Sequence, residues 1–490
     1  MIDIVFNKKE FEYDAYTLIK AFYPQEEVSI LYEGEEKTES SQKTEEAFLV
    51  VKITYNKEDT RLAILKNKET VFEETIFSAS DDERKERKNK LKQALYRGLS
   101  KETKKVLPWG DLTGIRPTKI AMGLIESGMS NVETAEFMRN TYYTSNEKTA
   151  LAITIANRER ALLADIDYKN GYSLYVGIPF CTTRCAYCSF SSGEIGDGHL
   201  VEPYLKALFR EIEACAEMAR EMGLHVRVGY IGGGTPSSLT TSQLESLLNH
   251  IEKHFGTMEE FTVEAGRPDT LDEQKLRMIH HHPVTRISIN PQTMNDETLV
   301  RIGRAHTAQQ TIQAYRLARH IGFDDINMDV IAALPGENYA MFAHTLEEIH
   351  KLQPESLTVH TLAIKRSSRL HEEKYAQREQ DVARMVALGR QTAHEMGMRA
   401  YYLYRQKYMA ENLENVGYAL PGCFCRYNID NMEETTSVLA LGAGGISKCV
   451  MKEEEKILRA PNIANIEQYI ERVDEMVERK YNVFSKKQID

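Results

Sequence analysis

LYVGIPFCTTRCAYC, residues Leu174–Cys188, is the stretch from which the rest of the chain can be interpreted. It begins with the short apolar run of a buried strand and ends in a loop with the spacing CxxxCxxC, formed by Cys181, Cys185 and Cys188. Barrels built from parallel strands carry their chemistry at the carboxyl ends of those strands, which is where this loop falls. The stretch therefore predicts a metal-ligating loop at one edge of a parallel sheet.

The number of thiols in this loop indicates what they hold. Structural zinc takes four protein ligands, whereas three cysteines on a [4Fe–4S] cluster leave one iron free to bind a small molecule. A zinc site with a distant fourth ligand, or a chance grouping of thiols, is the alternative. The chain has 7 cysteines, and this odd number favours metal ligation in a reducing compartment over a disulfide framework.

Strands alternate with helices from Ser173 onward, which is the pattern of βα units in a parallel sheet. The strand candidates are Leu174–Ile178, Val226–Ile231, Phe261–Glu264, Arg286–Ile289, Ile326–Ile331 and Leu357–Thr361. The helical stretches between them include Tyr204–Met222, Ser242–Phe255, Ala308–Ile321 and Phe342–Leu352. These units are too few to close an eight-stranded barrel, so the sequence predicts an α/β fold with an open, partial (β/α)6 barrel.

The residues before the barrel follow a different pattern. Strand-like and helical stretches there are Phe11–Phe22, Ala47–Tyr55, Arg61–Leu65, the charged segment from Ser80 to about Met122, and Asn146–Leu163. We therefore expect an N-terminal α+β domain with a helical linker at residues 1–165 and the barrel at 166–385. A mostly helical extension that covers the substrate is expected at 386–490.

Composition and charge argue against several classes of protein. The chain has 490 residues with 42% hydrophobic and 28% charged residues, which is ordinary for a globular protein. No apolar run approaches the length of a membrane span, and the first residues lack the apolar core of a signal peptide. A formal net charge of -11 argues against a nucleic-acid coat. We expect a cytoplasmic protein that binds neither nucleic acid nor membrane.

Further ligand-binding candidates lie at or near the ends of the later strands. Gly232-Gly233-Gly234-Thr235-Pro236 follows the second strand, and its missing side chains let main-chain N–H groups approach a ligand. Glu264 ends the third strand and Gln292 follows the fourth, where a solvated strand end is the alternative. Asp329 lies within an apolar strand, where a carboxylate is costly to bury unless a ligand or partner satisfies it.

These motifs together resemble the radical SAM superfamily, in which CxxxCxxC carries an aromatic residue, here Tyr187, before the third cysteine. The resemblance implies that S-adenosylmethionine (SAM) chelates the open iron of a [4Fe–4S] cluster and is cleaved to methionine and a 5′-deoxyadenosyl radical. It also implies that Phe180 and Tyr187 shield the cluster. The SAM-binding residues that it implies are Tyr175, Tyr187, Gly233, Gly234, Thr235, Glu264, Gln292, Arg304 and Asp329.

The wider pattern resembles one family within that superfamily. YVGIPFC, YIGGGTPSSL, RISINPQTM, IGRAHT and INMDVIAALPGE are similar to the oxygen-independent coproporphyrinogen III oxidases, and WGDLTGIRPTK with YYLYRQKYMAENLENVGY resembles their HemZ branch. The resemblance implies oxidative decarboxylation of two propionates of coproporphyrinogen III to give protoporphyrinogen IX. It also implies an electron donor such as flavodoxin or ferredoxin.

Arginines are the side chains best suited to the four carboxylates of such a substrate, because they bind carboxylates through two parallel hydrogen bonds. The candidates, chosen for their place after the sixth strand or within Tyr401–Asn428, are Arg366, Arg369, Arg405 and Arg426. A solvated surface arginine is the alternative for each. Cys423 and Cys425 form a CxC pair, which we interpret as ordinary thiols in preference to an auxiliary cluster.

Two other functions remain open from the sequence. CAYCSF is similar to the haem-chaperone branch of the family, so a haem-binding or haem-trafficking protein is one alternative. The haem-binding HNxxY element of that branch appears here as Tyr427–Asn431, without the histidine or the final tyrosine. A radical SAM enzyme that acts on haem itself is the other alternative.

Overall fold

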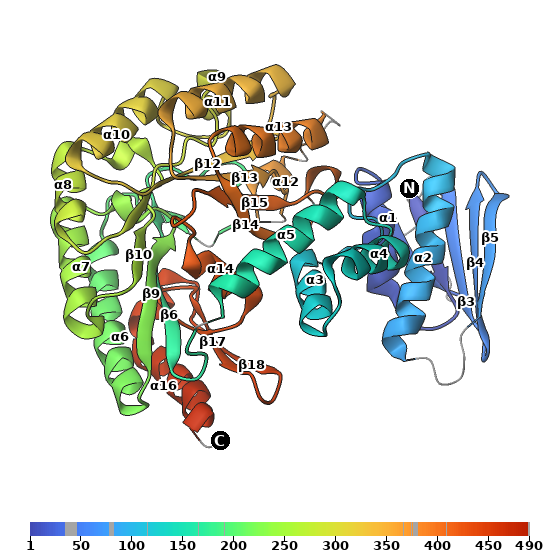
Figure 1. Ribbon diagram of the computed structural model, residues 1–490, viewed down its shortest axis with the longest axis horizontal. Helices are drawn as coiled ribbons and strands as arrows, with labels where there is room; N and C mark the ends of the chain where they lie inside the picture. The colour runs from blue at the N-terminus through green and yellow to red at the C-terminus, as the bar shows by residue number, and fades with distance from the viewer. Residues whose placement is uncertain are drawn as a thin grey trace. The chain divides into compact units, whose positions relative to one another are not determined.

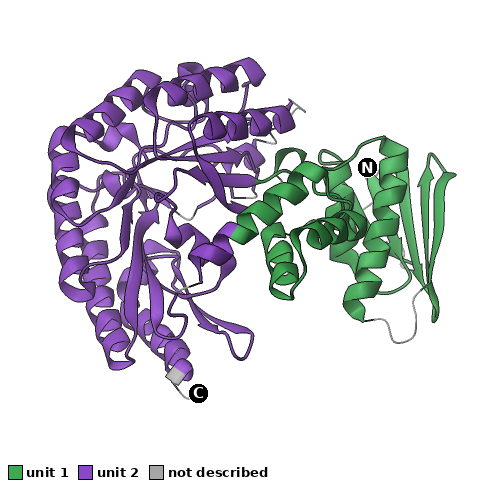
Figure 2. Ribbon diagram, viewed as in Figure 1, with its two compact units in different colours: residues 1–157, 376–379, 405–414 green, residues 158–375, 380–404, 415–490 purple. Residues whose placement is uncertain are grey.

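The computed structural model describes residues 1–34, 47–77, 83–114, 116–164, 166–190, 192–365, 367–373, 375, 381–407 and 409–488. The chain divides into two compact units, which Figure 2 distinguishes by colour. Unit 1 includes residues 1–157 and 405–414, and unit 2 includes 158–375, 381–404 and 415–490. Within the described residues, no helix is both long enough and apolar enough to cross a membrane.

Unit 1 is built on a five-stranded sheet with the order β2-β1-β3-β4-β5. Its elements are β1 (Ile2–Phe6), α1 (Glu12–Phe22), β2 (Val28–Tyr32), β3 (Leu49–Tyr55), β4 (Asp59–Lys66), β5 (Glu69–Phe77), α2 (Arg84–Thr103), α3 (Pro117–Glu126), α4 (Asn131–Tyr142) and α5 (Asn146–Leu162), whose last residues belong to unit 2. Alternate residues of β3 and β4 are buried, and they form one core with residues of α1 and α2. The predicted α+β character of this part of the chain is confirmed.

Unit 2 is built on an 11-stranded sheet with the order β14-β15-β13-β12-β11-β10-β9-β6-β16-β17-β18. Its strands are β6 (Gly171–Ile178), β9 (His225–Gly233), β10 (Glu260–Val263), β11 (Arg286–Ser288), β12 (Ile326–Ala332), β13 (Ser356–Thr361), β14 (Arg399–Tyr404), β15 (Asn415–Ala419), β16 (Ser437–Leu441), β17 (Ile446–Met451) and β18 (Lys456–Pro461). The central strands from β13 to β16 run parallel, and the outer ones are antiparallel. The expected open α/β barrel is confirmed.

Helices cover the outer side of the curved sheet of unit 2, as Figure 1 shows for α6, α7, α8, α10 and α11. The helices of this unit are α6 (Val201–Glu221), α7 (Thr241–Phe255), α8 (Glu273–His281), α9 (Asp296–Arg301), α10 (Ala308–Ile321), α11 (Tyr339–Leu352), α12 (Arg369–Glu372), α13 (Val382–Glu395), α14 (Arg426–Glu433), α15 (Ile466–Glu471) and α16 (Val473–Phe484). Thr240 and Thr307 start α7 and α10 with capping boxes. With the helices outside, the carboxyl ends of the parallel strands share one edge of the sheet.

All six strands predicted for the barrel are present, but the sheet continues on both sides of them. β16 pairs in parallel with β6, which is the strand that leads into the cysteine loop. The C-terminal region therefore contributes the strands β14–β18 in addition to its helices. The sequence of a short apolar run such as SVLAL does not predict which strand it pairs with, because strand pairing is decided by tertiary contacts.

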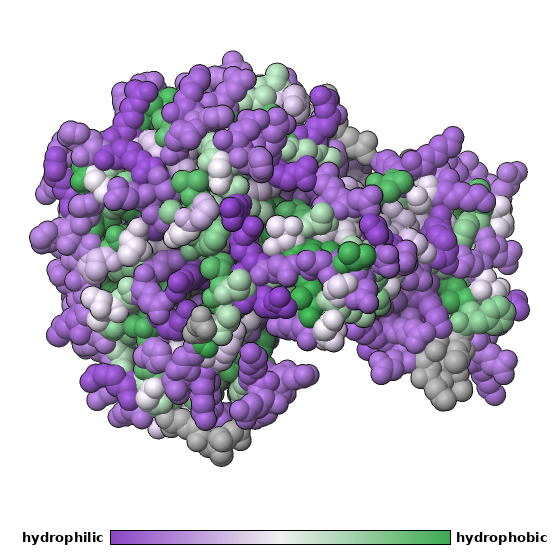
Figure 3. Space-filling model, in the orientation of Figure 1, coloured by the Kyte–Doolittle hydropathy of each residue, from purple (hydrophilic) through white to green (hydrophobic). Residues whose placement is uncertain are grey.

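Hydrophilic residues cover most of the visible face of the described chain, and hydrophobic ones appear among them in small groups (Figure 3). Scattered apolar side chains of this kind are normal for a protein surface. The chemistry of the molecule must therefore be sought at the strand ends.

Candidate active site

The cysteine loop leaves β6 through Pro179 and is fixed at both ends by main-chain hydrogen bonds. Phe180–Cys181 pairs with Gly193–Glu194 as the short parallel strands β7 and β8. The N–H of Cys188 donates to the carbonyl of Cys185 at 3.1 Å, which closes a turn between the second and third thiols. The loop therefore keeps its path through contacts of the protein itself.

The three thiols of the loop are free and partly exposed, so they are available to a ligand. Within the part of the chain that the structure describes, no three His, Cys, Asp or Glu side chains converge to hold a single metal ion. A cluster does not require such convergence, because it takes each thiolate on a different iron. The thiols thus fit an iron–sulfur cluster better than a zinc ion.

The glycine run at the end of β9 lies directly against the first cysteine. A Cβ added to Gly234 would lie 2.6 Å from the carbonyl oxygen of Phe180 and 2.9 Å from Sγ of Cys181. Gly233 has a φ of +114°, which disfavours a side chain, and the hydroxyl of Thr235 lies 3.5 Å from Sγ of Cys181. Only glycines allow this approach, and the N–H groups of Gly234 and Thr235 donate to the carbonyls of Ile178 and Phe180, each at 2.8 Å, which holds the glycine run against the start of the cysteine loop.

Glu264 and Asp329 are two carboxyl groups of this edge with opposite pKa shifts. Burial and the charge of Asp329 raise the pKa of Glu264 to about 8, although Arg304 acts in the other direction. Burial also opposes ionisation of Asp329, but hydrogen bonds with His360 and Asn327 hold its pKa below the usual value. Near neutral pH the site therefore contains one protonated and one ionised carboxyl group.

Two polar side chains at this edge have buried atoms without a protein partner. Gln292 has a left-handed φ of 65°, and its Oε1 is buried with no hydrogen bond from the described residues. Arg304 donates from Nη2 to the hydroxyl of Tyr187 at 3.2 Å and from Nη1 to the carbonyl of Gly266 at 3.2 Å, while its Nε has no partner among them. Such orphaned groups in a strained, buried setting fit a site built for a polar ligand.

Tyr175, the other predicted SAM contact, lies in a stack of tyrosines. Its ring centroid is 6.4 Å from that of Tyr230 and 6.0 Å from that of Tyr427. Burial raises the pKa of Tyr175, and so does the charge of Glu264. Tyr427, the first residue of the segment compared with the haem-binding element, is therefore part of a packed aromatic cluster.

The predicted substrate arginines that the structure describes have different surroundings. Arg369 begins α12, and the N–H of the next residue, Leu370, donates to the carbonyl of Ala186 within the cysteine loop at 3.1 Å. Arg369 therefore lies beside the candidate site. Arg366 lies outside the described residues.

Arg405, another predicted substrate arginine, is buried within unit 1. Its Nη1 donates to the carbonyl of Leu112 at 2.6 Å, and its Nη2 donates to the carbonyl of Asn412 at 2.8 Å. Burial lowers its pKa to about 10, and the charge of Glu414 counteracts this in part. The guanidinium of Arg405 thus donates to main-chain oxygens of its own unit, so its N–H groups are not free to form two parallel hydrogen bonds with a carboxylate.

Arg426, the last of the predicted substrate arginines, begins α14. Its main-chain N–H donates to Oε2 of Glu260, the first residue of β10, at 2.9 Å, and its guanidinium pairs with Glu259. Glu260 marks the amino end of the parallel strands, opposite the cysteine loop. The carbonyl of Cys423 is bonded at this same end by Arg286 and Ser356, the first residues of β11 and β13.

Sequence reasoning missed several charged residues of the site. Arg267 and Asp269 follow β10, His306 follows Arg304 in IGRAHT, and His360 of β13 places Nε2 3.7 Å from Oδ2 of Asp329. Lys365 is half-buried and interacts electrostatically with Cys188. A search for polar residues just beyond each strand would have found Arg267, Asp269 and Lys365, whereas His306 follows α9 and His360 lies within β13.

Comparisons with known proteins agree with this geometry. Residues 175–349 match the family described as the Radical SAM superfamily. The solved structure titled as coproporphyrinogen III oxidase (HemN) from Escherichia coli, a radical SAM enzyme, matches with a TM-score of 0.52 at 23% identity, over 65% of this chain and 73% of that chain. Residues 175–349 thus carry a Radical SAM domain, and the solved structure shows the same fold.

Relatives found by sequence identify the family to which the chain belongs. The oxygen-independent coproporphyrinogen-III oxidase-like protein HemZ of Bacillus subtilis is 38% identical over 93% of this chain and 92% of its own. Heme chaperone HemW of the same organism is 35% identical over 39% of this chain and 50% of its own. Within the superfamily, the chain belongs to the family of oxygen-independent coproporphyrinogen-III oxidase-like proteins represented by HemZ.

Proposed function

We propose that this protein is a cytoplasmic radical SAM enzyme that decarboxylates two propionates of coproporphyrinogen III to give protoporphyrinogen IX. The observation that carries the proposal is the meeting of the cysteine loop, the glycine run and the orphaned polar atoms of Gln292 and Arg304 at one edge of the sheet. The HemZ relationship supports the choice of substrate.

In this proposal each group of the chain has a defined task. Cys181, Cys185 and Cys188 hold a [4Fe–4S] cluster, and the main chain of Gly233–Thr235 receives the methionyl part of SAM. Glu264, Gln292, Arg304 and Asp329 offer the polar partners of the rest of the molecule. When bound there, a reduced cluster and SAM would supply a 5′-deoxyadenosyl radical to accept a hydrogen atom from a propionate, and loss of CO2 together with one electron to an external acceptor would complete each vinyl group.

The substrate carboxylates require cations beside the thiols. Arg369 is exposed and follows the loop that contacts Ala186, and the ammonium of Lys365 lies on the same loop near Cys188. We assign both to propionate binding, because exposed or half-buried cations can exchange water for a carboxylate at low cost. Arg369 replaces the larger set of arginines that the sequence suggested.

An anaerobic assay tests this function directly. The reconstituted protein is incubated with SAM, dithionite and coproporphyrinogen III, and 5′-deoxyadenosine and porphyrin products are followed together by chromatography and mass spectrometry. We expect 5′-deoxyadenosine together with loss of two CO2 from the porphyrinogen. Stable stoichiometric binding of haem without turnover would instead support a carrier, and SAM-dependent loss of haem would support an enzyme that acts on haem.

The pKa of Glu264 predicts a pH dependence of SAM binding. SAM carries a positive sulfonium, which favours the ionised carboxylate, so binding must release the proton that Glu264 holds below a pKa of about 8. We expect SAM affinity to rise as the pH increases towards about 8 and to level above it. Calorimetry in buffers of different ionisation enthalpy should detect the released proton.

Glu264→Gln should remove this proton release. The matched control is Glu273→Gln, since Glu273 is an exposed carboxylate of α8 in a salt bridge with Arg277. The control should keep the wild-type profile. If the wild-type protein itself bound SAM without releasing a proton, the assignment of Glu264 would be contradicted.

Substitution of Arg369 should weaken binding of the porphyrinogen without changing the affinity for SAM. We expect Arg369→Ala to raise KM for coproporphyrinogen III by about tenfold, because a charge-assisted hydrogen bond contributes ~1.5–3 kcal/mol and exposure reduces it. Initial rates at varied porphyrinogen concentration measure this. Arg426→Ala, at the amino ends of the strands, is the control and should leave KM unchanged; an equal effect of both would refute the assignment.

A further inference from the structure

A buried ion pair lies behind the cysteine loop. Arg267 and Asp269 follow β10, and their side chains are 4% and 14% exposed. Nε of Arg267 donates to Oδ1 of Asp269 at 3.1 Å, and Nη2 donates to Oδ2 at 3.0 Å. This is a bidentate fork, the strongest geometry available to an arginine and a carboxylate.

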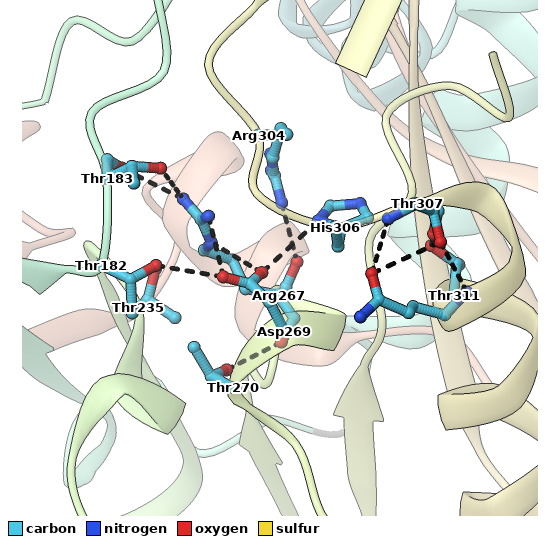
Figure 4. Close-up of polar contacts among 12 residues, drawn as sticks. Thr182, Thr183, Thr235, Arg267, Asp269, Thr270, Arg304, His306, Thr307 and Thr311 are labelled. Carbon is cyan, nitrogen blue, oxygen red and sulfur yellow. Dashed lines mark hydrogen bonds and ion pairs between the residues drawn. The ribbon is translucent and has the colours of Figure 1, made fainter. Parts of the chain in front are cut away.

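Both members of the pair reach into the cysteine loop, as Figure 4 shows. The hydroxyl of Thr182 donates to Oδ2 of Asp269 at 3.2 Å. The remaining guanidinium nitrogen of Arg267, Nη1, donates to the carbonyl of Thr183 at 3.0 Å and contacts its hydroxyl at 2.9 Å. These threonines lie between Cys181 and Cys185, so the ion pair sets the path of the chain from the first thiol to the second.

The same pair connects this loop to the loop after α9. Nδ1 of His306 lies 3.4 Å from Oδ1 of Asp269, and His306 is 3% exposed. The hydroxyl of Thr183 also donates to the carbonyl of Gly303 at 2.8 Å. Burial opposes ionisation of Asp269, yet the nearby imidazole of His306 and the hydrogen bonds from Arg267 hold its pKa well below the usual range. The carboxylate therefore stays charged and bonded.

A third connection runs to the loop that follows the glycine run. The hydroxyl groups of Thr270 and Ser237 are 2.5 Å apart. Nζ of Lys275 donates to the carbonyls of both residues, at 2.7 Å from Ser237 and 3.0 Å from Thr270. The short segment that carries the ion pair thus joins the cysteine loop to two other loops of the candidate site.

We propose that Arg267 and Asp269 are positioning residues that hold the cysteine loop in its ligating shape and thereby retain the iron–sulfur cluster. This inference rests on the proposed function, which makes Cys181, Cys185 and Cys188 the cluster ligands. The physical basis is preorganisation: a loop held by its own hydrogen bonds loses less freedom on binding a cluster, and a released thiolate stays close to its iron. Both residues act on the loop through Thr182 and Thr183, and neither belongs to the proposed ligand set.

The test is the rate of cluster loss. Asp269→Asn keeps the shape of the side chain but removes the charge that Arg267 and Thr182 contact. We expect the reconstituted variant, held anaerobically with an iron chelator, to lose its cluster absorbance about tenfold faster than the wild type, the lower end of the effect of residues that support metal ligands. Glu273→Gln, an exposed carboxylate of α8 paired with Arg277, is the matched control and should lose its cluster at the wild-type rate.

A second variant separates positioning from general stability. Arg267→Met combined with Asp269→Leu removes both buried charges, an exchange that often leaves stability unchanged. We expect this double variant to unfold in urea near the wild-type midpoint as apoprotein and still to lose its cluster faster, because Thr182 and Thr183 have lost their partners. If both variants lost the cluster at the wild-type rate, this inference would be overturned, but the proposed function would not. Failure of the wild type to assemble a cluster would overturn the proposed function, and this inference with it.

Discussion

Cys185→Ser should abolish both the cluster and the formation of 5′-deoxyadenosine. Cys185 is the middle ligand of the loop, and a serine hydroxyl of nearly the same size does not ionise at neutral pH to become a ligand. With two thiolates left, the cluster has no stable attachment. We expect iron and sulfide contents near zero after anaerobic reconstitution, no absorbance of the cluster, and product formation at the level of cluster-free protein.

Cys423→Ser is the matched control for that loss. Cys423 is also a free and partly exposed thiol, but its carbonyl is bonded to Arg286 at the amino ends of the strands. The control should keep ~4 irons per chain and full activity, as a single [4Fe–4S] cluster requires. Equal loss of iron in the two variants would show that the ligand set has been misassigned.

Lys480→Met should destabilise unit 2 by ~3–5 kcal/mol, the cost of leaving one charge of a buried pair alone. Nζ of Lys480 lies 2.7 Å from Oε1 of Glu211, and both side chains are 0% exposed. Oε2 of Glu211 also accepts the hydroxyl of Tyr469 and the N–H of Gly442, each at 2.7 Å. Methionine fills the space of the lysine but leaves this carboxylate without its cation.

Urea denaturation of the apoprotein, followed by circular dichroism, measures the effect. The control is Arg210→Met, because Arg210 pairs with Asp474 at 2.7 Å between the same helices, α6 and α16, at the surface. An exposed pair of this kind contributes at most ~1 kcal/mol. Glu211→Gln combined with Lys480→Met should recover part of the loss; destabilisation equal to that of the control would show that the buried pair is not needed.

The consequence of this pair extends to the strand that carries the cysteine loop. A Cβ added to Gly442, which follows β16, would lie 2.5 Å from the carbonyl oxygen of Gly177 in β6. Glu211 holds Gly442 by its N–H, so the buried network keeps the end of β16 against β6. Stability and the geometry of the site are therefore linked in this part of the barrel.

The sequence could not have revealed this network or the ion pair behind the cysteine loop. Glu211 and Lys480 are 269 positions apart, and an isolated lysine in a charged C-terminal helix is normally solvated. Arg267 and Asp269 stand close together in RPD, but nothing in that triplet shows that Thr182 and Thr183 are their partners. Long-range hydrogen bonds depend on how strands are paired, and local sequence patterns do not predict strand pairing.

The sequence did determine the central features of the protein. Apolar runs bounded by polar ends predicted the parallel strands, and the loop at Cys181–Cys188 with the glycine run predicted which edge carries the chemistry, because period and spacing are local properties. The tertiary structure decided where the arginines lie: Arg369 precedes the residue that bonds the cysteine loop, Arg405 is buried in unit 1, and Arg426 lies at the amino ends of the strands. A charged side chain looks the same in any sequence, and only the fold determines whether carbonyls, carboxylates or solvent surround it.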